Sequence, residues 1–147
     1  MSEQAITREQ FSFWAEVEVR WGDMDAQGHV NNAVYFTYCE TARIKLLRSI
    51  GVKGRSGGAA QGPTLVTTSC DFKQQVRYPT TLDIGVRLER VGQRSFELSY
   101  GMFRQGTDEL VAVARSVNAW VDFAQERAVT LPDEVRATLG QYKTESP

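Results

Sequence analysis

One long helical pattern, set between a single strand pattern and four later ones, limits the architectures open to this chain. Apolar residues recur at helical spacing from Tyr35 to Ile50 and form one stripe. Asn31 or Asn32 is positioned to cap the start of this helix, and Gly51 to end it. A helix with one apolar stripe needs a partner surface, and a single antiparallel sheet offers one apolar face. We therefore expect an α+β fold in which the sheet wraps around the helix.

The charged residues of this helix fall largely off its apolar stripe. Glu40, Arg43 and Arg48 are expected on the polar side, where Glu40 and Arg43 can form an ion pair. The helix should therefore bury one side and expose the other. The stripe consists of Tyr35, Tyr38, Cys39, Ala42, Leu46 and Ile50.

Five segments alternate apolar and polar residues, as strands with one solvated face do. The first begins near Glu16, with Val17, Val19 and Trp21 on one face. A short helix from Pro132 to Leu139 is expected to close the chain. In the four segments after the long helix, the residues that share a face are Val66, Thr68, Cys70, Phe72 and Val76; Leu82, Ile84, Val86 and Leu88; Phe96, Leu98, Tyr100 and Met102; and Val111, Val113, Val117, Ala119 and Val121 in a last strand from Leu110 to Phe123.

Length and charge agree with one ordinary domain. The 147 residues include 17 basic and 18 acidic side chains, a formal net charge of -1, so the chain lacks the basic excess that nucleic-acid binding requires. We expect a flexible N-terminus over residues 1–12 and one domain over residues 13–142. No apolar run approaches the roughly 18 residues that span a bilayer. The first residues do not resemble a secretory signal, so the expected location is cytoplasmic.

The two cysteines and the single histidine give no basis for a metal site. Cys39 and Cys70 lack CxxC spacing, and one His with two scattered Cys supplies too few soft ligands for zinc. We therefore expect neither a metal nor a cofactor. Both cysteines are interpreted as buried thiols in a reducing compartment, with a disulfide as the less favoured alternative.

The most informative segment precedes the long helix. It packs Asp23, Asp25 and His29 into a glycine-flanked loop that leads directly into the helix start. A helix N-terminus offers unpaired N–H groups that can polarise a carbonyl oxygen. An Asp just before it can attack the polarised carbon or activate a water molecule. These parts suit hydrolysis of an acyl group, and a thioester fits because its thiolate leaves with less acid assistance than an amine.

This segment resembles the 4-hydroxybenzoyl-CoA thioesterase-like branch of the hot-dog superfamily. That branch carries an Asp-x-Asp-x-x-Gly loop, which here reads Asp23-Met24-Asp25-Ala26-Gln27-Gly28, and the continuation through Tyr35 is typical of its bacterial acyl-CoA thioesterases. The resemblance runs from about Val17 to Leu139. It implies a hot-dog fold, with a five-stranded antiparallel sheet wrapped around one long central helix, and active sites at a dimer interface. It also implies acyl-CoA hydrolysis in lipid metabolism, without a metal.

The resemblance assigns roles to several residues of the loop and helix. The catalytic carboxylate of the family, a nucleophile or general base, maps onto Asp25. The backbone N–H that polarises the thioester carbonyl maps near Asn32. His29 is expected to order the loop or to transfer a proton, Asp23 to be structural, and Tyr35 to line the core or the pocket. The family's aromatic specificity is not transferable, because hydroxybenzoyl-specific members carry bulkier residues after the glycine of the loop.

Several residues after the helix are candidates for contacts with the CoA moiety. Arg77, Arg87, Arg90 and Arg94 are candidate phosphate contacts, because guanidinium pairs well with phosphate. The turn that ends at Ser95 resembles the turn that contacts the pantetheine arm or nucleotide in relatives. For each arginine, a solvated strand or turn charge is the simpler interpretation.

These observations together favour an acyl-CoA thioesterase that releases free carboxylic acid and CoA. The acyl carrier could be acyl-carrier protein in place of CoA. Because open sheet edges can pair between copies, we expect a homodimer at minimum, or a tetramer built from two dimers. The alternative is a hot-dog protein that binds acyl-CoA or acyl-carrier protein without hydrolysing it. A hydratase of the same fold is a third interpretation.

Overall fold

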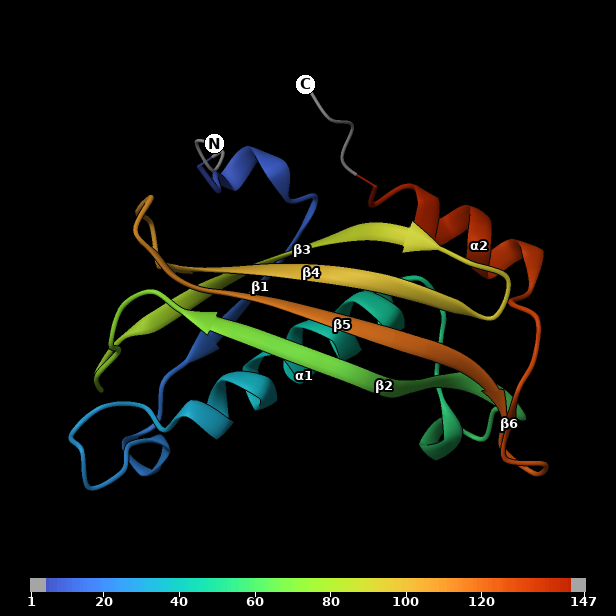
Figure 1. The fold of residues 1–147 in the computed structure, drawn as a ribbon, viewed down its shortest axis with the longest axis horizontal. Coiled ribbons are helices and arrows are strands. Elements are labelled where there is room, and N and C mark those ends of the chain that lie inside the picture. Colours follow the sequence, from blue (N-terminus) through green and yellow to red (C-terminus); the bar gives the residue numbers. More distant parts are fainter. Residues whose placement is uncertain (1–4, 144–147) are drawn as a thin grey trace.

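A curled antiparallel sheet wraps around one long helix in the computed structural model, which describes residues 5–143 (Figure 1). The strands are β1 Phe13–Glu18, β2 Gln61–Phe72, β3 Thr81–Val91, β4 Ser95–Arg104, β5 Leu110–Asp122 and a short β6 Arg127–Ala128; the helices are α1 Asn32–Ser49 and α2 Asp133–Gly140. The five long strands lie in the order β1-β3-β4-β5-β2, and β6 pairs with β5. This is the hot-dog fold, and the predicted fold class is confirmed.

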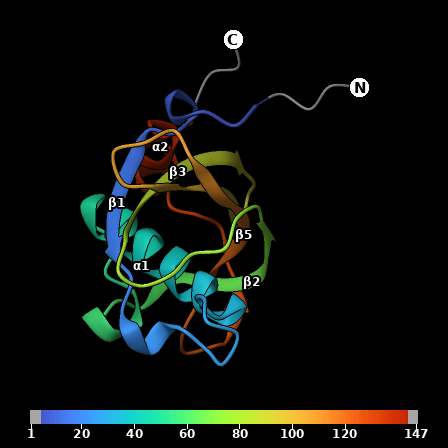
Figure 2. The same cartoon turned by 90° about the vertical axis from the view of Figure 1, so that its left-hand side faces the viewer.

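Helix α1 lies inside the curve of the sheet, as the end view in Figure 2 shows. The Asn31 side chain caps it by accepting a hydrogen bond from the Ala33 N–H at 2.9 Å. Tyr38, Ala42 and Leu46 are buried against the sheet, as the stripe predicts. The helix ends at Ser49, two residues before Gly51, the glycine expected to end it.

Arg43 departs from the predicted pattern. We expect it on the polar side of α1, but its side chain enters the core, where the residue is only 7% exposed. Its guanidinium donates to the Tyr100 hydroxyl at 3.2 Å, and that hydroxyl lies 2.7 Å from the Ser116 hydroxyl. Asn118 also donates to Ser116, at 3.1 Å. This buried polar chain across β4 and β5 accommodates the arginine, while the predicted Arg43–Glu40 ion pair is present at 4.0 Å.

Strand β5 turns its more polar face inward. Ala112, Ala114, Ser116, Asn118 and Trp120 are the buried set, so most of the valines predicted on one face share the outer face of the sheet. The hydrogen bonds around Ser116 satisfy the polar groups that this arrangement buries.

Two further expectations about the strands are wrong, each at a point where the chain departs from regular strand geometry. Trp21 does not continue the buried face of β1: the chain leaves the strand at Glu18, and Trp21 is 73% exposed in a short 3-10 turn. In β2, a bulge between Leu65 and Thr67 leaves Val66 without a partner on β5. In the sequence, the alternation of apolar and polar residues continues through both positions. No local sequence signal therefore marks the end of β1 or the bulge in β2.

The segment before β1 covers part of the outer sheet face. Phe11 is 6% exposed and packs over Gly85 and Gly101, which are paired across β3 and β4. A Cβ atom at Gly101 would lie 2.6 Å from the Phe11 ring, so the two glycines leave the space that the ring fills. Of the twelve residues expected to be flexible, 1–4 lie outside the described residues, whereas Phe11 is packed on the sheet.

Both cysteines are free thiols, so the disulfide alternative is wrong. Cys39 is buried as predicted, but Cys70 on the edge strand is only half-buried. Burial raises the pKa of the Cys39 thiol to about 12 and that of Cys70 to about 11. Neither helix within residues 5–143 has the length and apolarity that crossing a bilayer requires.

Candidate active site

The loop between β1 and α1 folds back on itself and returns to the helix start. The Asp25 N–H donates to the His29 carbonyl at 3.2 Å, and the Gly28 N–H donates to the Asp25 carbonyl at 3.0 Å. Gly28 has a φ of 83°, a backbone conformation that glycine adopts without strain. The Asn31 N–H donates to the Asp23 carbonyl at 3.0 Å. These bonds hold the loop in one compact turn beside α1.

The Asp25 carboxylate is fixed by the same residue that caps the helix. The Asn31 side-chain amide donates to one carboxylate oxygen of Asp25 at 2.9 Å, and the Gln27 N–H donates to the other at 2.8 Å. The carbonyl oxygen of the Asn31 side chain meanwhile accepts from Ala33. One asparagine therefore ties the position of the carboxylate to the position of the first helical N–H groups.

The first backbone donor of α1 remains available. The Ala33 and Val34 N–H groups are both taken up by Asn31, at 2.9 and 3.0 Å. For the Asn32 N–H, the structure records no acceptor among residues 5–143. A free N–H at the positive end of a helix can donate to an oxygen that develops negative charge.

Asp23 is the structural carboxylate of the pair. It is 2% exposed and accepts hydrogen bonds from the Tyr38 hydroxyl at 2.7 Å and from the Arg20 backbone and guanidinium at 2.9 Å. Burial acts to raise the pKa of Asp23, but the bonds from Arg20 and Tyr38 outweigh it and hold that pKa below its usual value. The pKa of Tyr38 is raised, by burial and then by its bond to Asp23. Asp23 thus anchors the loop to the middle of α1.

A cleft of about 300 Å³ opens beside the helix start. It brings together three residues singled out from the sequence: His29, Asn32 and Tyr35. His29 places Nδ1 3.2 Å from the Val30 carbonyl oxygen, and the buried Tyr35 ring meets the Phe72 ring edge-on at 5.0 Å. Burial raises the pKa of the Tyr35 hydroxyl. The Asp25 carboxylate is not part of the cleft wall but is joined to the helix start through Asn31.

The other half of the cleft wall was missed by sequence reasoning. It consists of Phe72, Lys73, Gln74 and Gln75, from the end of β2 and the connection that follows. These residues lie some forty positions from the loop in the chain, and only the pairing of strands brings them beside it. Within residues 5–143, no three or more His, Cys, Asp or Glu side chains lie together so that they could hold a metal ion.

The candidate CoA contacts divide between the two ends of the fold. Arg77 lies in the β2–β3 connection, close to the cleft. Arg90, Arg94 and Ser95 lie around the β3–β4 turn near α2, at the opposite end of the sheet (Figure 1). Arg87 lies on the outer face of β3, where it pairs with Glu89 at 2.6 Å. A single copy of the chain therefore does not bring these residues together.

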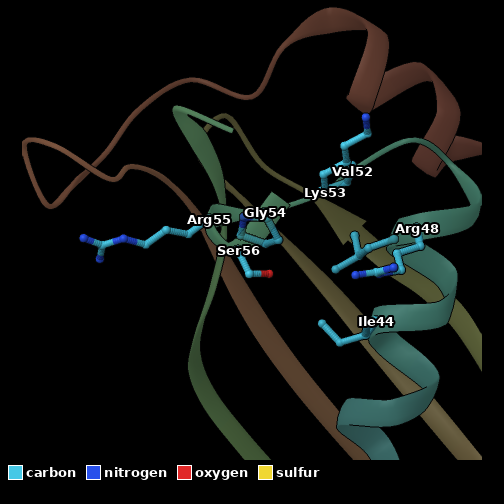
Figure 3. A pocket seen from close by; sticks show the side chains of 9 residues that line it. Ile44, Arg48, Val52, Lys53, Gly54, Arg55 and Ser56 are labelled. Atoms are coloured by element: carbon cyan, nitrogen blue, oxygen red, sulfur yellow. The ribbon is translucent and has the colours of Figure 1, made fainter. Parts of the chain in front are cut away.

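A second pocket, of about 260 Å³, lies at the C-terminal end of α1 (Figure 3). Ile44 and Val52 contribute apolar surface, and Arg48 extends from the helix toward the following loop, while Arg55 points away from the pocket. The eighteen residues of α1 make the helix about 27 Å long, and this pocket lies on its second half, away from the helix start. The two hollows are thus separate sites within one copy.

The chain matches the family model described as the thioesterase-like superfamily over residues 19–139. It is 30% identical over 139 residues to the chloroplastic acyl-acyl carrier protein thioesterase ATL2 of Arabidopsis thaliana, covering 87% of this chain and 68% of that protein.

Solved structures agree with this match. The PA5185 protein of Pseudomonas aeruginosa PAO1 superposes with a TM-score of 0.89 at 30% identity, covering 96% of this chain and 98% of that one. The PA2801 protein of P. aeruginosa, described as a putative thioesterase, gives a TM-score of 0.80 at 32% identity, covering 88% and 99% of the two chains. The chain therefore belongs to the thioesterase-like superfamily of hot-dog proteins and is a thioester hydrolase.

Proposed function

We propose that this protein hydrolyses an acyl-CoA thioester to a free carboxylic acid and CoA. The observation that carries the proposal is the coupling made by Asn31, which binds the Asp25 carboxylate at 2.9 Å and caps α1. The Asn32 N–H at the start of this helix has no acceptor within the part of the chain that the structure describes. A carboxylate and a backbone donor held in fixed relation at a helix start are the two groups that acyl hydrolysis needs.

In the proposed reaction, the thioester carbonyl oxygen accepts a hydrogen bond from the Asn32 N–H. Asp25 then either attacks the carbonyl carbon or removes a proton from a water molecule that attacks it. If Asp25 attacks, the carbon–sulfur bond breaks to give a mixed anhydride of the acyl group and Asp25, and water then hydrolyses this anhydride to the free acid and the Asp25 carboxylate. If Asp25 acts as a base, the hydroxyl of the attacking water replaces the sulfur directly. In both routes CoA leaves as a thiolate that takes up a proton released by the water. His29 orders the loop, and Tyr35 with Phe72 forms an apolar wall for the acyl group.

A panel of acyl-CoAs of different length and aromaticity tests this proposal. We expect free thiol to appear with time for at least one member, measured with a thiol reagent, because the described groups act on the thioester and not on a particular acyl chain. If acyl-CoAs raise the melting temperature but no thiol is released, the non-catalytic binding alternative holds instead. An absorbance change with an enoyl-CoA, without thiol release, would indicate a hydratase.

We also propose that two copies pair through the free edge of β2. Among residues 5–143, this twelve-residue strand pairs only with β5. Its exposed edge carries Leu65, Val66 and Phe72, which are 43%, 62% and 43% exposed. An unpaired strand with apolar side chains is a ready template for another strand. Antiparallel pairing about a two-fold axis sets the start of one β2 beside the end of the other, so Arg90, Arg94 and Ser95 would approach the cleft from the second copy.

The pairing predicts a dimer, or a tetramer of two dimers, by light scattering at micromolar concentration. Val66→Lys should shift this protein toward the monomer, because it places a charge on the proposed contact. Gln125→Lys, in an exposed turn, adds the same charge elsewhere and should leave the mass unchanged. A monodisperse wild-type monomer would rule the pairing out.

A further inference from the structure

The connection between β2 and β3 is held rigidly beside the candidate active site. The Lys73 N–H donates to the Val111 carbonyl at 2.8 Å, and the Val76 carbonyl accepts from the Val30 N–H at 2.8 Å. Val76 itself is fully buried. The backbone of this connection is therefore fixed to β5 on one side and to the loop before α1 on the other, while most of its side chains remain exposed.

Two hollows meet along this connection. The cleft at the helix start includes Lys73 and Gln75, and a neighbouring hollow of about 400 Å³ includes Gln75, Arg77 and Arg104. Gln75 lines both, so the two hollows adjoin at this residue, and together they are called the groove below. Four residues of fully extended chain span at most about 14 Å, which sets the largest separation of the Lys73 and Arg77 backbones.

Two of the three cations that line the groove have no carboxylate partner in the described part of the chain. Within the described part of the chain, neither Lys73 nor Arg77 forms an ion pair, and both are exposed. Arg104 differs, because it pairs with Glu109 at 3.1 Å and donates to the Gln75 carbonyl at 3.0 Å. Arg104 therefore holds the backbone of the connection at Gln75, and Lys73 and Arg77 are the two lining cations without an ion pair in the described part of the chain.

We propose that this groove binds the phosphate end of the pantetheine arm of the substrate, with Arg77 as the principal contact and Lys73 as the second. This inference rests on the proposed function, which puts the thioester at the helix start. From there the arm has to leave the cleft, and the hollow lined by Arg77 adjoins the cleft at Gln75. Guanidinium matches phosphate geometry, and a rigid backbone limits the entropy lost on binding.

The proposal separates two sets of arginines. Arg77 would bind the phosphate of a substrate whose thioester lies beside Asp25 of the same copy. Arg94 would reach that cleft only from a second copy. The phosphate next to pantetheine is common to CoA and to the prosthetic group of acyl-carrier protein, so both carriers present the chemistry that the groove would recognise.

The test compares substrates with and without the phosphate. We expect Arg77→Ala to raise KM for acyl-CoA about tenfold or more, since a charged hydrogen bond is lost, with kcat nearly unchanged. Lys73→Ala should do so by a smaller factor. Arg77→Ala should leave KM unchanged for the same acyl group carried on N-acetylcysteamine, which has no phosphate, because Arg77 lines the neighbouring hollow and not the cleft. Arg127→Ala, which removes an exposed charge from β6, is the matched control and should change neither value.

The outcomes distinguish this inference from the proposed function. An equal KM shift with acyl-CoA and acyl-carrier protein assigns the groove to the phosphate they share, and a shift with acyl-CoA alone assigns it to the pyrophosphate of CoA. If the wild type hydrolyses both acyl-CoA and the N-acetylcysteamine thioester but Arg77→Ala alters neither KM, the inference is wrong and the function stands. A shift caused by Arg94→Ala, with Arg77→Ala silent, would also overturn it.

Discussion

Replacing Asp25 by Asn should lower the turnover number on a good acyl-CoA substrate by about 10²- to 10⁴-fold, the range that a positioned acid or base contributes. Asn keeps the shape of Asp but can neither attack a carbonyl carbon nor take a proton. Its side chain still accepts a hydrogen bond from Asn31 or Gln27, so the loop and the cap of α1 should persist. The melting temperature should therefore change little, and initial rates of thiol release measure the effect.

Asp108→Asn is the matched control for this variant. The Asp108 side chain is 96% exposed in the turn before β5, so the same loss of one negative charge there should leave turnover at the wild-type value. Near-wild-type turnover in purified Asp25→Asn protein would remove Asp25 from the chemistry and leave the helix start without its reacting group.

Replacing Asp23 by Asn should mainly lower stability. The carboxylate accepts hydrogen bonds from the buried Tyr38 hydroxyl and from Arg20. The amide of Asn would place its N–H groups against some of these donors, so those hydrogen bonds would be lost. We expect a loss of about 2–3 kcal/mol in the free energy of unfolding, the scale for hydrogen bonds to a charged group. Urea unfolding measures it. A loss of activity at full stability would contradict the structural role of Asp23.

The same variant has a defined pH dependence. The pKa of Asp23 is lowered in the folded protein, so its ionised form stabilises the fold above the unfolded value of about 3.9. That stabilisation is lost as the pH falls below this value and through the lowered folded pKa. The stability difference between the wild type and Asp23→Asn should therefore be constant near neutral pH and shrink in acid. A difference that grew in acid would contradict the lowered pKa.

Periodicity and caps predict most of the fold because they are local. The stripe from Tyr35 to Leu46 and the cap at Asn31 define α1, and strict alternation defines β3 and β4. Arg43 shows where this reasoning stops: its partner Tyr100 lies fifty-seven residues away, and nothing near Arg43 in the sequence announces a polar group in the core. The packing of Phe11 could not be predicted for the same reason, since the space that its ring fills exists only when Gly85 and Gly101 are paired.

The candidate site also contains residues that local sequence patterns predict and residues that only the folded sheet brings into place. Asp25, His29 and Asn32 are found from the sequence because one short loop and a helix start contain them. Lys73 and Gln75 are not, because β2 has to end beside that loop before they can line the cleft. Composition alone also could not rank Arg77 against Arg94, since both are exposed cations near turns. The topology of the sheet separates them by placing the β3–β4 turn at the far end.

The most direct test of the account is a crystal structure of Asp25→Asn protein bound to an intact acyl-CoA substrate. We predict that the thioester carbonyl oxygen lies about 2.7–3.1 Å from the backbone nitrogen of Asn32. The side chain at position 25 should face the carbonyl carbon on the side away from the departing sulfur. A thioester bound away from the start of α1, or a residue 25 that faces bulk solvent with the substrate in place, would contradict the account.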